Sequence, residues 1–304
     1  MYHQRSAAQW VQDLGQLGIH PAAFAGGEND KCNIHAVSLC NLLLACLSAS
    51  FKGAREAQSN MVATCNIGWH GFAWLDKGCA GQNMKTVIFD LDGTLADTSG
   101  DLIAAANHCF RDMGAGDVLD PTQDQGTALR GGRAMLTLGM KRLGRVDDTA
   151  EIDRYYPVLL EAYGAAIDVH TFMYPGAMDA VESLKAMGYG VGICTNKPEG
   201  LAELLLGRLG VRDQFGSLVG ADTLPVRKPN PEPLFEAARR AGGHPDRCAL
   251  IGDSDTDRNT ARAAGVPSVL VTFGPSGDDM AALSPEALLH DYADLPSLID
   301  RLLA

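Results

Sequence analysis

Residues 88–95 read Ile-Phe-Asp-Leu-Asp-Gly-Thr-Leu (IFDLDGTL), and this stretch sets two carboxylates, Asp90 and Asp92, at the end of an apolar run. The run at 86–89 is short and continuous, which is typical of a strand buried on both faces of a parallel sheet. Residues two apart on a strand point the same way, so both carboxylates address one site, and Gly93 lets the chain turn away. Close carboxylates repel each other, so the pair costs free energy unless a cation or a shared proton offsets it.

Strands and helices alternate after residue 170. The expected strands lie at 189–194, 248–251 and 267–271, and each follows a helical pattern, the first two of these patterns at 177–187 and 231–241. Strands separated by helices of this length indicate right-handed crossovers and an open parallel sheet. Ligands of such sheets bind beyond the carboxyl ends of the strands. The sequence therefore predicts an α/β fold of the Rossmann-like type with its ligand site at those ends.

Residues 99–170 depart from this alternation. Helical patterns at 102–113, 126–143 and 151–167 follow one another without a convincing strand between them. An all-helical insertion directly after the first strand is typical of a lid over the ligand edge of the sheet. The alternative is that these helices only pack against the sheet.

Residues 1–83 differ in composition from the rest of the chain. They contain all three tryptophans and five of the eight cysteines, and their five basic residues balance five acidic ones, so the remainder carries the whole formal net charge of −12. The segment shows no sustained periodicity and no repeat. We therefore expect a poorly structured extension without a recognisable domain. A small accessory or targeting domain is one alternative, and a misassigned gene start, with Met84 as the natural first residue, is another.

The acidic balance bears on partners and location. Nucleic acid and anionic membranes both require a basic face, so neither is expected as a main partner. The longest apolar run, at 36–49, has 14 residues, which is short for a membrane span. The cysteines form no CxxC pair and show no metal-ligand spacing, so we expect no disulfide framework and a cytoplasmic location.

A second acidic cluster, Gly252-Asp-Ser-Asp-Thr-Asp257, ends the strand expected at 248–251. Two strand ends that present carboxylates make an oxygen-lined site for a hard divalent cation. Mg2+ is the first candidate, because it takes few protein carboxylates and keeps several waters. Asp90 and Asp253 suffice as its ligands, and a metal there relieves the repulsion between the two aspartates of the first strand end.

Two further strand ends supply groups for a phosphoryl ligand. Thr195 and Asn196 end the strand expected at 189–194 and offer a hydroxyl and an amide. Lys228, in Arg227-Lys-Pro-Asn-Pro231, precedes a helix and places a positive charge beside two prolines. A cation, a lysine, a hydroxyl and helix N-termini that converge on one point suit a transferring phosphoryl group.

Taken in their order along the chain, the motifs resemble those of the haloacid dehalogenase-like (HAD-like) hydrolase superfamily. The four motifs are Asp90-Leu-Asp92-Gly-Thr94, Thr195, Lys228 and Gly252-Asp253-Ser-Asp-Thr-Asp257. Tyr174-Pro-Gly176, Thr195-Asn-Lys-Pro198 and Lys228-Pro-Asn-Pro231 add similarity to the phosphoglycolate phosphatase branch. Each motif alone has a simpler interpretation as a turn, a solvated loop or a helix cap, whereas the ordered set is specific.

The resemblance covers residues 84–304 and implies a domain organisation. It implies a HAD-like catalytic core at 84–98 and 171–304, with an all-helical cap at 99–170. It also implies a role for each carboxylate of the first motif. Asp90 is the expected nucleophile, which forms an aspartyl-phosphate. Asp92 is the expected general acid and base, and its backbone carbonyl would join Asp90 and Asp253 on Mg2+.

The remaining roles concern the phosphoryl group. The resemblance implies that Thr195, Asn196 and Lys228 bind the phosphoryl oxygens and that Asp257 orients Lys228 or metal-bound waters. An aspartate at position 92 also distinguishes between the enzyme classes of the superfamily. The ion pumps have threonine there and the dehalogenases lack this aspartate, so its presence favours phosphatases and phosphomutases.

The expected substrate is a small phosphorylated metabolite, most of all 2-phosphoglycolate, hydrolysed to glycolate and phosphate by a monomer or homodimer. Arg130 and Arg133, in Arg130-Gly-Gly-Arg133, stand where related caps place a substrate-facing loop, and either would pair with the substrate carboxylate. The alternative is a solvated arginine on a helix. Rival functions are another small-molecule phosphatase, a pyrophosphatase, a sugar phosphomutase, or a phosphate-binding protein without catalysis.

Overall fold

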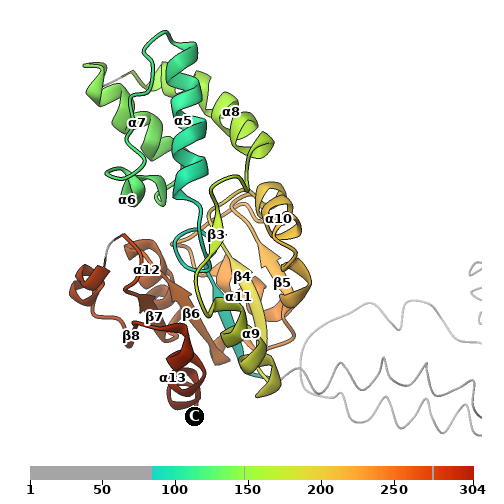
Figure 1. The fold of residues 1–304 in the computed structure, drawn as a ribbon. Coiled ribbons are helices and arrows are strands. Elements are labelled where there is room, and N and C mark those ends of the chain that lie inside the picture. Colours follow the sequence, from blue (N-terminus) through green and yellow to red (C-terminus); the bar gives the residue numbers. More distant parts are fainter. Residues whose placement is uncertain (1–83, 147, 276) are drawn as a thin grey trace, which may run out of the picture. The chain divides into compact units, whose positions relative to one another are not determined.

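The computed structural model of the chain describes residues 84–146, 148–275 and 277–304 (Figure 1). The expectations for residues 1–83, namely a poorly structured extension, an accessory domain or a misassigned start, lie outside the described residues. Among the described helices, none combines the length and the apolar composition that crossing a membrane requires.

Within the described residues, six parallel strands form the main sheet, in the spatial order β5-β4-β1-β6-β7-β8. The strands are β1 (Thr86–Phe89), β4 (Gly190–Cys194), β5 (Ser217–Val219), β6 (Cys248–Gly252), β7 (Ser268–Val271) and β8 (Ala287–Leu289). The predicted open parallel sheet is thus confirmed, with β1 between β4 and β6. The strands β5 and β8 have only three residues each and were not anticipated, because so short a run carries little periodic signal.

Helices cover both faces of this sheet (Figure 1). Every residue of β1 is buried, as expected of a central parallel strand. Val87 and Phe89 belong to the core that includes α9, α10 and α13, whereas Ile88 belongs to the core that includes α11 and α12. These helices are α9 (Ala177–Ala186), α10 (Glu199–Arg208), α11 (Glu232–Arg240), α12 (Asp255–Ala264) and α13 (Leu295–Leu302).

Four helices form the insertion after β1, and they gather beyond one end of the sheet (Figure 1). They are α5 (Ser99–Asp112), α6 (Gln125–Ala128), α7 (Gly132–Arg142) and α8 (Thr149–Ala165). The short strands β2 (Ala96–Asp97) and β3 (Phe172–Met173) pair antiparallel where the chain leaves for these helices and returns. The Asp101 carboxylate also joins the two ends, since it accepts hydrogen bonds from the backbone amides of His170 and Thr171.

The prediction of one helix over residues 126–143 is wrong. The structure has two helices there, α6 and α7, with a break at Leu129, Arg130 and Gly131. Gly131 has φ 94°, a backbone conformation that side-chain-bearing residues rarely adopt. Two adjacent glycines also weaken a continuous helix. The break places the Arg130 loop at the edge of the sheet.

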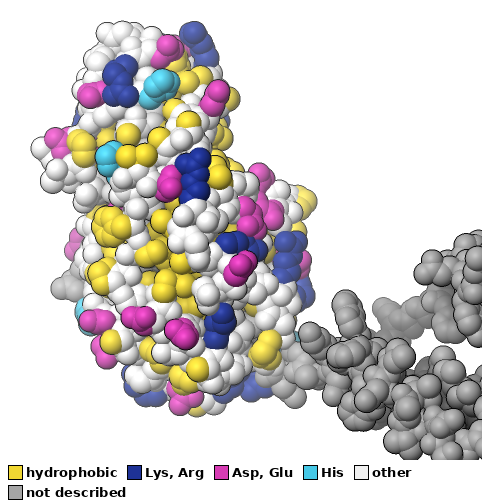
Figure 2. Space-filling view, turned by 45° about the vertical axis from the view of Figure 1, so that its right-hand side comes forward, with side chains coloured by type: hydrophobic (Ala, Val, Ile, Leu, Met, Phe, Trp, Pro, Cys, Tyr) yellow, Lys and Arg dark blue, Asp and Glu magenta, His cyan; other side chains and the backbone are white. Residues whose placement is uncertain are grey.

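Charges of both signs mix on one face of the molecule. On the face of the described residues drawn in Figure 2, Lys and Arg side chains are scattered among Asp and Glu side chains. This face therefore presents no broad basic area.

Candidate active site

Three strand ends supply the centre of the site. Asp90 follows β1, Thr195 follows β4 and Asp253 follows β6. Since β1 lies between β4 and β6, the carboxyl ends of these strands are neighbours. Lys228 comes from the loop before α11, and Asp257 lies in the first turn of α12. Residues far apart in the chain thus meet at one edge of the sheet.

Lys228 links two of the carboxylates. Its Nζ lies 2.9 Å from Oδ2 of Asp90 and donates a hydrogen bond of 2.7 Å to Oδ1 of Asp257. Burial by itself lowers the pKa of Lys228, but the adjacent Asp257 and Asp90 carboxylates raise it above its ordinary value. The lysine is therefore a fixed positive charge beside Asp90.

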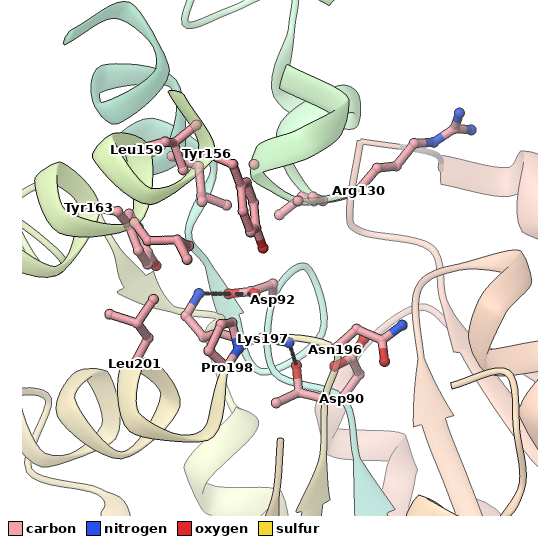
Figure 3. Close-up of a pocket in the computed structure, with 16 residues that line it drawn as sticks. Asp90, Asp92, Arg130, Tyr156, Leu159, Tyr163, Asn196, Lys197, Pro198 and Leu201 are labelled. Atoms are coloured by element: carbon pink, nitrogen blue, oxygen red, sulfur yellow. Dashed lines mark hydrogen bonds and ion pairs between the residues drawn. The ribbon is translucent and has the colours of Figure 1, made fainter. Parts of the chain in front are cut away.

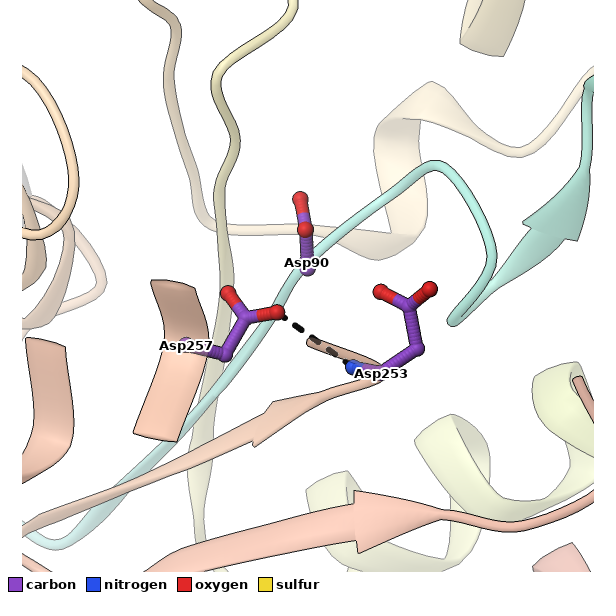
Figure 4. Close-up of side chains that lie close together, drawn as sticks. All are labelled: Asp90, Asp253 and Asp257. Carbon is purple, nitrogen blue, oxygen red and sulfur yellow. Dashed lines mark hydrogen bonds between the residues drawn. The ribbon is translucent and has the colours of Figure 1, made fainter. Parts of the chain in front are cut away.

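Asp90, Asp253 and Asp257 form an acidic cluster in which one ligand atom from each lies within 4.8 Å of the others (Figure 4). Burial raises the pKa of Asp90 to about 6, against the opposing effect of Lys228. Burial, followed by the charges of Asp257 and Asp90, raises the pKa of Asp253 well above its ordinary value. One lysine does not balance three carboxylates, so the cluster suits a hard divalent cation.

Asp257 is the least available of the three as a metal ligand. Its Oδ1 accepts from Lys228, and its Oδ2 accepts from the Ser254 hydroxyl at 2.5 Å and from the Asp253 amide at 3.3 Å. Asp90 and Asp253 have fewer such partners, and the Thr94 hydroxyl donates to Asp253 over 3.3 Å. The residues present fit a cation held by Asp90 and Asp253, with Asp257 as the partner of Lys228.

Gly93 allows the first loop to approach this cluster. A Cβ atom there would lie 2.3 Å from Oδ2 of Asp253, which is far inside van der Waals contact. The φ of 79° at Gly93 also disfavours any side chain. Gly93 is thus required where the loop turns past Asp253.

Asp92 has a different environment from Asp90. Its Oδ1 accepts hydrogen bonds from Lys197 Nζ at 2.7 Å and from the Thr98 hydroxyl at 2.8 Å. Lys197 Nζ also lies 3.0 Å from Oδ2 of Asp92. Figure 3 shows the ammonium of Lys197 directed at Asp92, away from Asp90. The two carboxylates of the first motif therefore have different basic partners.

Sequence reasoning did not assign Lys197, Thr98 or Tyr163 to the site. The available signal for Lys197 was its place in Thr195-Asn-Lys-Pro198, directly after a predicted strand. Thr98 and Tyr163 offered no such signal, because their approach to the site depends on the fold. Tyr163 lies in α8, and its ring centroid is 4.5 Å from Lys197 Nζ.

Thr195 and Asn196 lie where the sequence placed them, at the end of β4. Thr195 is buried, and its hydroxyl oxygen accepts the backbone amide of Lys197 at 3.2 Å. The Asn196 side chain donates to the backbone carbonyl of Lys228 at 3.0 Å. Asn196 thereby connects the loop after β4 to the loop that carries Lys228.

Two cavities adjoin these groups. The larger, of about 520 Å3, is polar and includes Asp90, Lys228 and Asp253 in its lining. The smaller, of about 100 Å3, lies between the inserted helices and the sheet edge, and both Asp90 and Asp92 line it. Asp253 thus faces the larger cavity, Asp92 faces the smaller one, and Asp90 lines both.

The two arginines of the insertion are placed differently from these groups. Arg133 pairs with Asp153 at 2.7 Å, and its guanidinium lies 4.8 Å from the ring centroid of Tyr156. Arg130 lines both cavities, but its guanidinium points away from Asp92 (Figure 3). Recognition of a substrate carboxylate by either arginine stays a prediction.

The fold and these motifs agree with a known family. A sequence profile of the haloacid dehalogenase-like hydrolase family matches residues 84–265. The chain belongs to this family, and the predicted resemblance is confirmed.

The chain is similar to curated phosphoglycolate phosphatases. The protein of that name from Mesorhizobium japonicum is 36% identical over 221 residues, which cover 71% of this chain and 96% of the relative. The one from Rhodospirillum rubrum is 39% identical over 219 residues, which cover 69% of this chain and 89% of the relative. The expected class, an enzyme resembling phosphoglycolate phosphatases, is thus confirmed.

Solved structures show the same fold. One described as a predicted phosphoglycolate phosphatase from Haemophilus somnus is 25% identical, with a TM-score of 0.60 over 71% of this chain and 97% of that one. A hydrolase from Pseudomonas syringae is 22% identical, with a TM-score of 0.58 over 73% of this chain and 100% of that one.

Proposed function

We propose that the chain is a Mg2+-dependent phosphatase that hydrolyses 2-phosphoglycolate to glycolate and phosphate through an aspartyl-phosphate on Asp90. One observation carries the proposal, namely the separation of the two carboxylates. Asp90 pairs with Lys228 in the acidic cluster, whereas Asp92 pairs with Lys197, and both aspartates line the smaller cavity. This division matches a nucleophile on one side and a proton-transfer group on the other. The names of the curated relatives support the choice of substrate.

The first half-reaction uses Asp90 as the nucleophile. A carboxylate oxygen of Asp90 attacks phosphorus, the bond from phosphorus to the ester oxygen breaks, and Asp92 gives its proton to the departing oxygen. Lys228 and Thr195 hold the phosphoryl oxygens during this step. Lys228 is already within 2.9 Å of Asp90, so its charge offsets the negative charge of the attacking carboxylate.

The second half-reaction restores the enzyme. Asp92 removes a proton from water, the water oxygen attacks the phosphorus of the aspartyl-phosphate, and phosphate leaves with Asp90 regenerated. Asp90 and Asp253, with the backbone carbonyl of Asp92, would hold Mg2+, which supplies positive charge for the transferring phosphoryl group. Asp257 orients Lys228 through the 2.7 Å hydrogen bond between them.

We also propose the division of the chain into a catalytic core, residues 84–98 and 171–304, and a helical cap, residues 99–170. The cap would exclude water from the smaller cavity during the first half-reaction. The described cysteines, which are Cys109, Cys194 and Cys248, are free thiols, and they support a location in the cytoplasm.

The proposal is tested by phosphate release from a panel of compounds with and without Mg2+. We expect 2-phosphoglycolate to be the best substrate, with pyrophosphate and glucose 1-phosphate well behind. Asp90→Asn abolishes turnover, whereas Asp179→Asn, at an exposed carboxylate of α9, leaves it unchanged. Phosphate redistribution without net release would instead indicate a mutase. Binding of phosphate esters without any turnover would contradict an enzymatic role.

Two further arms address the remaining predictions. Comparing the full chain with a chain that begins at Met84 tests whether residues 1–83 contribute to activity. Replacing Arg130 and Arg133 singly by Ala, and comparing 2-phosphoglycolate with a neutral ester, tests whether either arginine recognises the carboxylate. Equal losses on both substrates would exclude that role.

A further inference from the structure

The smaller cavity contains a buried cation that the reaction scheme above does not use. Lys197 lines this cavity, and its side chain is 3% exposed. We propose that Lys197 and the hydroxyl of Tyr163 bind a carboxylate on the leaving group, so that the enzyme selects phosphate esters of short 2-hydroxy acids. This inference rests on the proposed function and identifies the residues that set its substrate class.

Lys197 has hydrogen-bonding capacity left for a ligand. An ammonium group has three N–H donors, and the Asp92 carboxylate takes at most two of them. The ring of Tyr163, 4.5 Å away, holds the ammonium in place by a cation–π contact. The remaining donor is available at the wall of the cavity.

Tyr163 provides an independent sign of a ligand. Its side chain is 1% exposed, it lines the same cavity, and its hydroxyl has no hydrogen-bond partner within the described part of the chain. Buried hydroxyl groups are almost always hydrogen-bonded, so an unpaired one is expected to bind a water molecule or a ligand. An oxygen of a carboxylate is a suitable acceptor for it.

The size of the cavity limits the leaving group. A cavity of about 150 Å3 accommodates benzene, with six heavy atoms. The cavity here is about 100 Å3, which fits roughly four or five heavy atoms. Leu102, Leu159 and Leu201 form part of its walls, so a sugar would place some of its hydroxyl groups against apolar side chains.

The position of the cation limits the chemistry of the leaving group. Asp92 must reach the ester oxygen to protonate it, and Lys197 Nζ lies 2.7 Å from an oxygen of Asp92. A carboxylate one carbon from the ester oxygen would therefore meet Lys197 while Asp92 meets that oxygen. The guanidinium of Arg133 is engaged by Asp153, and that of Arg130 points away from Asp92 (Figure 3). Lys197 is thus the better-placed cation for this carboxylate.

The test compares two substrates that differ only in the carboxylate, namely 2-phosphoglycolate and ethyl phosphate. For Lys197→Gln we expect kcat/KM on 2-phosphoglycolate to fall roughly 10- to 100-fold more than on ethyl phosphate, as for a lost hydrogen bond to a charged group. Tyr163→Phe, which keeps the ring, should produce a smaller selective loss, about 5-fold. The matched control is Lys141→Gln, at an exposed lysine of α7, which should leave the ratio unchanged.

Equal losses on both substrates would overturn the inference, since they would mean that Lys197 acts only by positioning Asp92. Circular dichroism checks that each variant folds. If Lys197→Gln does not fold, Tyr163→Phe provides the test. Calorimetric binding to the Asp90→Asn protein separates this inference from the proposed function. If no ester is hydrolysed, the proposed function fails. The recognition site would still be upheld if the protein bound 2-phosphoglycolate more tightly than ethyl phosphate and if Lys197→Gln removed this difference. Equal binding of the two compounds would refute it.

Discussion

Replacing Asp90 by Asn should make the metal-free protein more stable at neutral pH while it removes activity. Asp90 lies in a buried cluster with Asp253 and Asp257, and one lysine pairs with Asp90 and Asp257. An amide has nearly the same shape as a carboxylate but no charge. The variant therefore keeps the packing and relieves the cost of an ionised, buried Asp90.

The magnitude follows from the pKa of Asp90, which burial raises from the ordinary 3.8 to about 6. That difference corresponds to about 3 kcal/mol at 1.36 kcal/mol per pH unit. Because the folded-state pKa is the higher one, folding takes up a proton between pH 4 and 6. The wild-type protein consequently loses up to about 3 kcal/mol of stability as the pH rises through this window, and the variant does not. Asp253 increases the difference in stability between the variant and the wild type, since the Asp90 charge helps to raise the Asp253 pKa.

Urea unfolding of the metal-free protein, followed by circular dichroism between pH 4.5 and 7.5, measures this difference in stability. We expect the stability of the variant relative to the wild type to rise up to about pH 6 and then to level off. The stability of Asp179→Asn should follow that of the wild type at every pH. Mg2+ should then stabilise the wild type more than the variant, because binding uses Asp90. A gap between variant and wild type that stays constant with pH would refute the reasoning.

Three further substitutions probe the same geometry. Lys228→Met should lower kcat at least 1,000-fold. It should also destabilise the metal-free protein by roughly 3–5 kcal/mol in urea unfolding, because it leaves buried carboxylates without their counter-charge. Unchanged stability would contradict the pairing of Lys228 with these carboxylates. Gly93→Ala should abolish Mg2+ binding measured by calorimetry, since its Cβ would displace Asp253, and normal binding would show that the loop yields. Gly131→Ala should lower the stability by about 1–2 kcal/mol, because alanine rarely adopts a φ of 94°. No clash adds to this cost, since no atom lies within 4 Å of the added Cβ. A stabilised variant would show that the break between α6 and α7 is not fixed.

The sequence by itself determined the parallel sheet and most of the site. Continuous apolar runs marked β1, β4, β6 and β7, because strands buried on both faces consist mainly of apolar residues. Polar residues directly after such runs must lie at the ligand edge of the sheet. Asp90, Thr195 and Asp253 were therefore predictable from local sequence alone.

Only the tertiary structure decided which charges meet. Lys197 pairs with Asp92 across 105 positions in the chain, and Arg133 pairs with Asp153 instead of facing the site. Local periodicity reports whether a residue is buried, but not which distant partner the packing brings to it. The break at Gly131 was likewise hidden, because two helices in succession leave the same apolar pattern as one.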